Sequence, residues 1–170
     1  MKRMVLLIIA AVLLNGCATY QTTIPDGYTG PTATIKDTAK IIDSGKADFF
    51  YLSYIDGKRI EDSRIKSMIA SHGQGNYLSI VLLDNSVPAE EHIFTIVGRT
   101  EYAMPIRALS GTVFEVKGDV AFSPEANEKY VVKGSLSEEK SIVWIEKVSS
   151  GEVIDKIEVE GSSKLGFWSK

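Results

Sequence analysis

The sequence predicts a mainly β protein: a single antiparallel β-sandwich of about seven to nine strands, with at most one short helix, behind an N-terminal signal peptide. From residue 33 onward, apolar residues recur with a period of two, which is typical of strands. Turn residues separate these segments at regular spacing. Polar residues on most of these strands favour a soluble sandwich over a membrane barrel, whose lipid-facing band would be apolar.

The chain begins with a short basic segment followed by an apolar run. Lys2 and Arg3 precede residues 4–14, all of which are apolar. A helix of this length would reach about 16 Å, roughly half of a bilayer hydrocarbon core. The run is therefore too short to span a membrane, and it is typical of the apolar region of a secretory signal.

The apolar run ends in Leu14, Asn15, Gly16 and Cys17. This segment resembles the lipobox of bacterial lipoprotein precursors, which has leucine three positions before the cysteine and a small residue just before it. Leu14, Gly16 and Cys17 match, whereas Asn15 differs from the usual residue. The resemblance implies cleavage between Gly16 and Cys17 and acyl chains on Cys17. Ala18 after the cysteine implies the outer membrane of a diderm cell, with the body facing the periplasm.

Charge and cysteine content narrow the function classes. Cys17 is the only cysteine, which excludes an internal disulfide and a zinc site built on several thiolates. Loss of Lys2 and Arg3 with the signal peptide leaves 17 of the 19 basic side chains against 22 acidic ones, a net charge of −5. This balance predicts no nucleic-acid partner, and acyl chains would have to provide the membrane attachment. We expect no cofactor.

Three regions are predicted: a signal peptide over 1–16, a lipidated flexible tether over 17–32 and a β domain over 33–170. The tether is rich in Thr, Gly and Pro and contains Pro25-Asp26-Gly27. As flexible chain it would span about 20–24 Å. The body would then stand away from the membrane surface.

The strongest strands of the body are expected at 47–55 and 111–122. Asp56-Gly57 follows the first and predicts a tight hairpin. Gly118 lies on the apolar side of the second and indicates a bulge or a close approach. The expected strands are residues 33–42, 47–55, 77–83, 92–97 (ended by Gly98), 111–122, 130–136, 141–148 and 153–159, the last two paired across Ser149-Ser150-Gly151.

The expected helix covers residues 62–71. Asp62 can cap it, and Ile65, Met68 and Ile69 share one face. On the last strand, Val153, Ile157 and Val159 are expected to face one way and Ile154 the other. The side chains predicted to be buried in the core are Trp144, Phe114, Val116 and Phe122.

Catalytic patterns are weak in this sequence. Ser63…Lys66 and Ser137…Lys140 have the Ser-x-x-Lys spacing of penicillin-binding enzymes, but the other motifs of that class are missing. His72 and His92 have no metal-ligand partner at a usual spacing. Gly73-Gln74-Gly75 lacks the third glycine of a dinucleotide site. We assign no catalytic and no metal-binding residue.

Aromatic residues give the candidate partner surface, which is Phe49, Tyr51, Tyr54 and Trp168. Phe49 and Tyr51 lie on one face of the strand 47–55, and Tyr54 lies on the other. One face would be exposed to a partner, unless a loop or the short helix covers it. Trp168 would either close the body as a plug or anchor a partner.

Three functions remain open. The first is a non-enzymatic envelope lipoprotein that binds or scaffolds an envelope protein or polymer. The second is an envelope hydrolase that acts on peptidoglycan or a similar polymer, which would need a cleft where His72 or His92 meets a nucleophile or an acid. The third is a lipoprotein component of a secretion or assembly machine, recruited through an open strand edge.

Overall fold

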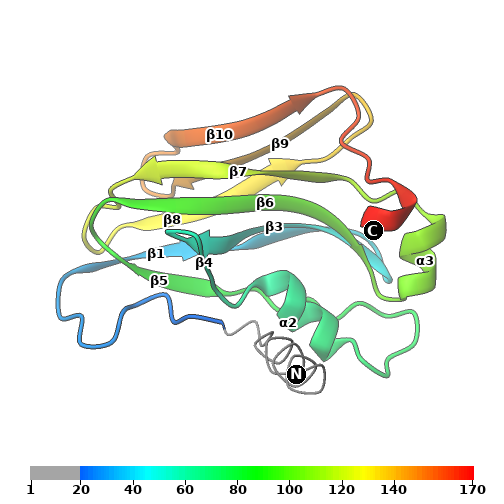
Figure 1. The fold of residues 1–170 in the computed structure, drawn as a ribbon, viewed down its shortest axis with the longest axis horizontal. Coiled ribbons are helices and arrows are strands. Elements are labelled where there is room, and N and C mark those ends of the chain that lie inside the picture. The colour runs from blue at the N-terminus through cyan, green and yellow to red at the C-terminus, as the bar shows by residue number, and fades with distance from the viewer. Residues whose placement is uncertain (1–19) are drawn as a thin grey trace, which may run out of the picture.

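The computed structural model describes residues 20–170, which form ten strands in two five-stranded sheets (Figure 1). The first sheet has the order β10-β9-β8-β1-β5, and the second has the order β2-β3-β6-β7, with β4 also paired to β3. The predicted mainly β, sandwich-like fold is therefore confirmed. The strands are β1 (Thr32–Lys36), β2 (Thr38–Asp43), β3 (Lys46–Ile55), β4 (Lys58–Arg59), β5 (Asp84–Pro88), β6 (His92–Tyr102), β7 (Glu115–Phe122), β8 (Lys129–Ser135), β9 (Lys140–Lys147) and β10 (Val153–Glu160).

The expected strand over 33–42 is split between the two sheets. β1 belongs to the first sheet and β2 to the second, and Asp37 alone connects them. β1 also pairs in parallel with β8, with Ile35 opposite Tyr130, so the first sheet is mixed rather than purely antiparallel. A period-two pattern does not reveal such a crossing, because both halves keep the same alternation.

The main core lies between the two sheets. Phe50, Leu52 and Phe94 come from the second sheet and pack against residues of the first. Val116 is buried there as predicted. The residues of the first sheet in this core are Ala33, Ile35, Val87, Tyr130, Val132, Val143 and Ile145.

Three predicted side chains are less buried than expected. Trp144 is half-buried, because Val143 and Ile145 of β9 point into the core and the tryptophan between them points outward. Its placement in the core was wrong. Phe114 and Phe122 are also half-buried, although Phe122 packs against the edge of the core.

Two hairpins are confirmed. Asp56 and Gly57 both have positive φ, at 51° and 72°, as the tight turn between β3 and β4 requires. β9 and β10 pair across the turn that ends at Gly151, where φ is 72°. The expected close approach at Gly118 is confirmed as well, because a Cβ there would lie 2.7 Å from the side chain of Ile157.

Two strand details differ from expectation. β10 has an irregular register between Val153 and Asp155, which places Ile154 with Ile157 against the core instead of on the opposite face. β6 continues through Gly98 to Tyr102 rather than ending at the glycine. Gly98 suits this crowded position within the strand, because a Cβ there would lie 3.1 Å from both Phe50 and Val116.

The predicted helix is present as α2 (Ser63–Ala70), and the Asp62 side chain caps it by accepting a hydrogen bond of 2.8 Å from the Ile65 N–H. Its orientation differs from expectation: Ser63 and Ser67 are buried, whereas Ile69 is 66% exposed. A second helix, α3 (Pro105–Ser110), and a short 3₁₀ turn, η1 (Phe167–Ser169), are also present, where at most one short helix was expected.

The expected strand over 77–83 does not join either sheet. Its alternate N–H groups instead donate to the hydroxyls of three serines spaced four residues apart in and after α2. The pairs are Ser79 N to Ser71 Oγ, Val81 N to Ser67 Oγ and Leu83 N to Ser63 Oγ, each 2.8 Å long. Successive serines, four residues apart on the helix, are separated by a rise of about 6 Å. Successive N–H donors, two residues apart in the extended segment, are separated by about 6.6–6.8 Å, so donors and acceptors stay nearly in step. This segment therefore satisfies part of its backbone on the serine face of α2.

Candidate functional site

The predicted lipidation site lies outside the described residues. Cys17 and Gly16 precede Tyr20, where the structural description begins. No helix among residues 20–170 is long and apolar enough to cross a membrane. Cleavage at Gly16 and acylation of Cys17 therefore remain predictions.

Most of the segment predicted as a tether is held against the body. The Gln21 N–H donates to the Arg59 carbonyl at 2.8 Å, and Gln21 also forms a parallel bridge with Ile60. Farther along, the Ala89 N–H donates to the Pro31 carbonyl at 2.9 Å. The chain is therefore attached to the body at Gln21 and at Pro31, where a flexible tether as far as residue 32 was expected. The Gly and Pro residues of this segment predicted its turns, but they did not predict the backbone hydrogen bonds that attach it to the body.

The four candidate partner residues are not brought together. Phe49 is 0% exposed and Tyr51 is also buried, because Leu78, Met68 and neighbouring side chains cover this outer face of β3. β3 is thus buried on both faces, which is the alternative that the sequence left open, and neither aromatic forms an exposed surface. Tyr54 is half-buried beneath Lys117, whose Nζ lies 4.7 Å from the ring centroid.

Trp168 is the exception among these four residues. It is 94% exposed and packs edge-on against Phe167, with 5.1 Å between the ring centroids. The side chain does not close the body as a plug. It remains available to a partner.

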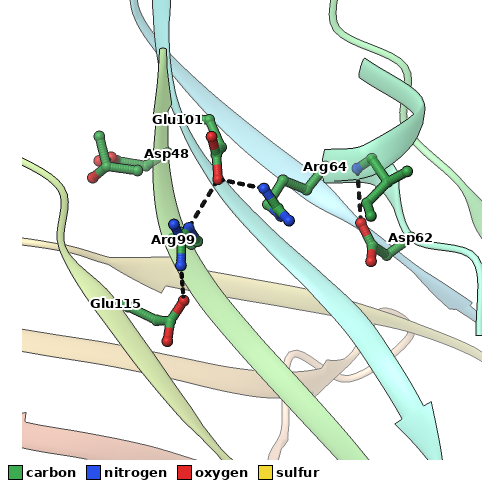
Figure 2. A network of polar contacts seen from close by, with 8 residues as sticks. Asp48, Asp62, Arg64, Arg99, Glu101 and Glu115 are labelled. Carbon is green, nitrogen blue, oxygen red and sulfur yellow. Dashed lines mark hydrogen bonds and ion pairs between the residues drawn. The ribbon is translucent and has the colours of Figure 1, made fainter. Parts of the chain in front are cut away.

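A network of charged side chains fastens α2 to the outer face of the second sheet (Figure 2). Arg64 of α2 donates to Glu101 of β6 at 2.8 Å, and Arg99 Nε donates to the same carboxylate oxygen at 2.9 Å. Arg99 also pairs with Glu115 of β7. Burial alone would lower the pKa of the Arg64 guanidinium, but the neighbouring Glu101, Tyr51 and Asp62 together outweigh burial and raise the pKa. The two cations and two anions balance, which favours a structural clamp over a ligand site.

A buried carboxylate lies at the point where the chain crosses between the sheets. Asp37 is fully buried, and its Oδ1 accepts from the Leu52 N–H at 3.0 Å and from Asn85 Nδ2 at 3.2 Å. Its Oδ2 accepts from the Ser63 hydroxyl at 2.6 Å. One side chain thus connects β3, β5 and the start of α2. Nothing in the local sequence of Asp37 distinguishes it from a strand residue on a solvent face.

His92 lies in a cleft where the folded N-terminal segment meets the β3–β4 hairpin. Its Nδ1 is 2.7 Å from Asp56 Oδ2, and the Ile93 N–H donates to the other oxygen of Asp56 at 2.9 Å. Nε2 is buried without a hydrogen-bond partner among residues 20–170, and the Glu90 carboxylate is 3.8 Å away. The cleft has a volume of about 210 Å³, and Thr22, Thr23 and Lys58 contribute to its lining. His92 is therefore less exposed than expected.

Both Ser-x-x-Lys pairs are engaged in structural contacts. Ser63 binds Asp37, and Lys66 pairs with Glu61 at 2.5 Å. Ser137 Oγ donates to the Lys140 carbonyl at 2.8 Å and so closes a turn.

The glycines after α2 form a turn, and the described residues offer no metal-binding cluster. Gly73 and Gly75 have positive φ, at 80° and 65°, in the turn after α2. In the described part of the chain, no group of three or more potential ligands could hold a metal ion. Comparison with protein-family models, curated proteins and solved structures finds no match to this chain.

Proposed function

We propose that this chain is an envelope lipoprotein, anchored through an acylated Cys17, whose β body binds or scaffolds another envelope component without catalysis. The observation that carries the proposal is the lipobox resemblance: an apolar run too short to span a bilayer ends at the only cysteine. The body supports a non-enzymatic role, because its buried Asp37 and its Arg64–Glu101 pair hold structural elements together.

The folded N-terminal segment implies that the anchor holds the body close to the bilayer. Gln21 already pairs with the body, so only three residues separate the fixed backbone from Cys17. The four residue-to-residue steps from Cys17 to Gln21 span at most about 14 Å when fully extended. This is shorter than the 20–24 Å expected for a free tether of sixteen residues. The proposed function therefore includes a body held close to the membrane surface.

The direct test is fatty-acid labelling of the wild type and of Cys17→Ser. We expect labelled fatty acid to enter the wild type and not the variant, because the thioether needs the thiol. Cleavage at Gly16 should also be lost in the variant. Labelling is followed by gel autoradiography, and cleavage by intact mass. Equal labelling of both proteins would overturn the anchor.

A second chain removes the complication of the uncleaved apolar run. A conventional cleavable signal fused directly to Ala18 should release the body into the soluble periplasmic fraction, because acyl chains dominate membrane affinity. Fractionation with and without high salt measures the result. Retention that resists salt would contradict the lipid anchor.

An envelope hydrolase is the second candidate, and the His92–Asp56 pair favours it. The imidazole lines a cleft and contacts an acid, which is half of a catalytic arrangement. The pair also has a structural role, since Asp56 closes the hairpin turn and holds the Ile93 N–H. Nε2 has no hydrogen-bond partner within residues 20–170, and the Glu90 carboxylate at 3.8 Å lies beyond hydrogen-bond distance.

The histidine test separates these two functions. We expect a chain with His72→Gln and His92→Gln to complement a deletion strain as the wild type does at equal protein level, because the contact at His92 is structural. The free energy of unfolding should fall by less than about 1 kcal/mol, as for a partly exposed pair. The single His72→Gln variant is the matched control. Loss of complementation only when His92 is replaced, with normal folding, would favour the hydrolase.

A further inference from the structure

α3 and the C-terminal segment form one exposed apolar surface, hereafter the α3 surface, at one end of the sandwich. Ile106 is 63% exposed, Phe167 55% and Trp168 94%. Lys170 Nζ donates to the Leu109 carbonyl at 3.1 Å, which joins the segment to α3, and Figure 1 shows the two side by side. Phe167 and Trp168 alone expose on the order of 300 Å². Single exposed apolar residues are common, whereas the largest apolar patch of a monomeric protein, typically a few hundred Å², is often functional.

The charge of the α3 surface is opposite to that of the rest of the body. Residues 103–114 and 161–170 contain Arg107, Lys164 and Lys170 and no acidic side chain. Within the described residues, none of these three cations forms an ion pair with an Asp or Glu side chain. The chain after residue 16 is nevertheless net acidic. The α3 surface is therefore a cationic, apolar area on an acidic protein.

We propose that the α3 surface docks onto an anionic lipid bilayer. Exposed tryptophan beside lysine and aliphatic side chains is the composition that partitions into the membrane interface. The cations complement anionic headgroups and stay in water while the apolar side chains enter the acyl boundary. Trp168 and Ile106 project outward, which suits insertion into a fluid layer.

We choose a lipid bilayer as the partner of the α3 surface because of the proposed anchor. The anchor brings the body within about 14 Å of the bilayer. Figure 1 shows α2 below the sheets and α3 at one end of them, and Gln21 pairs with Ile60 just before α2. The acyl chains on Cys17 and the α3 surface would then be two attachment points on one body. Together they would fix the orientation of the sandwich against the membrane.

The test uses tryptophan quenching by brominated lipid. The chain has two tryptophans, so Trp144→Phe leaves Trp168 as the reporter, and Trp168→Phe leaves the half-buried Trp144. The mature lipidated protein is reconstituted into vesicles of phosphatidylglycerol and brominated phosphatidylcholine. We expect Trp168 emission to fall at least twofold relative to unbrominated vesicles, and Trp144 emission to change little.

Charge variants test the electrostatic part. Lys164→Gln should lower the quenching of Trp168, because it removes an exposed charge without touching the Lys170 contact that joins the segment to α3. Zwitterionic vesicles should at least halve the quenching. Lys129→Gln removes the same charge from an exposed position elsewhere and should leave the quenching unchanged.

Failure of lipid binding by the α3 surface can be distinguished from failure of the Cys17 anchor. If flotation shows that the protein is bound to the vesicles while Trp168 is not quenched, the lipid surface is wrong, and self-association or an acidic protein on the α3 surface takes its place. If no fatty acid enters Cys17, the anchor is wrong. The same quenching experiment at high lipid concentration then tests whether the α3 surface binds lipid, because this docking needs no acyl chain. Absence of quenching there would overturn the lipid surface.

Discussion

Asp37→Ala should lower the free energy of unfolding by about 3–5 kcal/mol. The substitution leaves the Leu52 N–H, the Asn85 amide and the Ser63 hydroxyl buried without their acceptor. Each unsatisfied buried donor costs about 1–3 kcal/mol. The loss is large because Asp37 is the only residue between β1 and β2. Its side chain therefore connects both sheets to α2. Urea denaturation at pH 6 measures it.

The same carboxyl makes stability depend on pH. Burial raises the pKa of Asp37 from 3.8 to about 7, against the opposing effect of its hydrogen bonds from Ser63 and Leu52. Between these two values the folded protein holds a proton that the unfolded chain releases. The free energy of unfolding therefore falls as the pH rises from about 4 to 7 and levels off above 7. Burial also raises the pKa of Asp48 and Asp62, which act in the same direction.

Asp37→Asn isolates this contribution, because it keeps the size of the side chain and cannot ionise. From pH 5 to pH 7 the wild type should lose about 2–3 kcal/mol more than the variant, at 1.36 kcal/mol per pH unit. Asp84→Asn is the matched control, since that carboxylate on the neighbouring strand is 63% exposed. Parallel pH profiles for the wild type and Asp37→Asn would contradict the raised pKa.

Gly134→Ala should destabilise the protein by about 2–4 kcal/mol, because β8 and β3 approach each other closely at this position. A Cβ at Gly134 would overlap the Phe50 ring and would lie 2.5 Å from the Ile142 carbonyl oxygen. Overpacking in a dense core usually costs about 1–3 kcal/mol, and more where the backbone must move. Gly166→Ala is the matched control, since a Cβ there meets nothing within 4 Å and the φ of −65° suits alanine.

A double-mutant cycle identifies Phe50 as the cause. Phe50→Ala alone should cost about 3–5 kcal/mol, because the ring is buried in the main core. Combined with Gly134→Ala, the total should be clearly less than the sum, since the new methyl group fills part of the space that the ring leaves. Chemical denaturation of the four proteins gives the coupling energy. Simple additivity would show that the glycine is needed for another reason.

The surroundings of Asp37, Ser63 and His92 could not be predicted from the sequence. Asp37 lies in a weakly alternating segment, and its importance depends on donors 15 to 48 residues away in the chain. Local periodicity did not predict that Ser63 and Ser67 are buried in α2. They became the buried face because an extended segment with free N–H groups packs against them. His92 was expected at a solvent edge, and the folding back of residues 21–26 placed it in a cleft.

The sequence by itself determined the local features of this protein. Period-two alternation produced most of the strands, Asp56-Gly57 and Gly151 produced their hairpins, and Asp62 produced the start of α2, because each effect acts within a few residues. The lipobox resemblance likewise depends only on adjacent residues. These features could be predicted without knowledge of the rest of the chain.

Only the tertiary structure decided which faces are buried. An alternating strand presents two faces, and the choice between them depends on what packs against each one. β3 is covered on both sides, Trp144 points outward, and residues 77–83 bond to serine hydroxyls rather than to a strand. Several segments distant in sequence could bond to the same N–H groups or cover the same apolar side chains. Which of them does so depends on the packing of the whole chain.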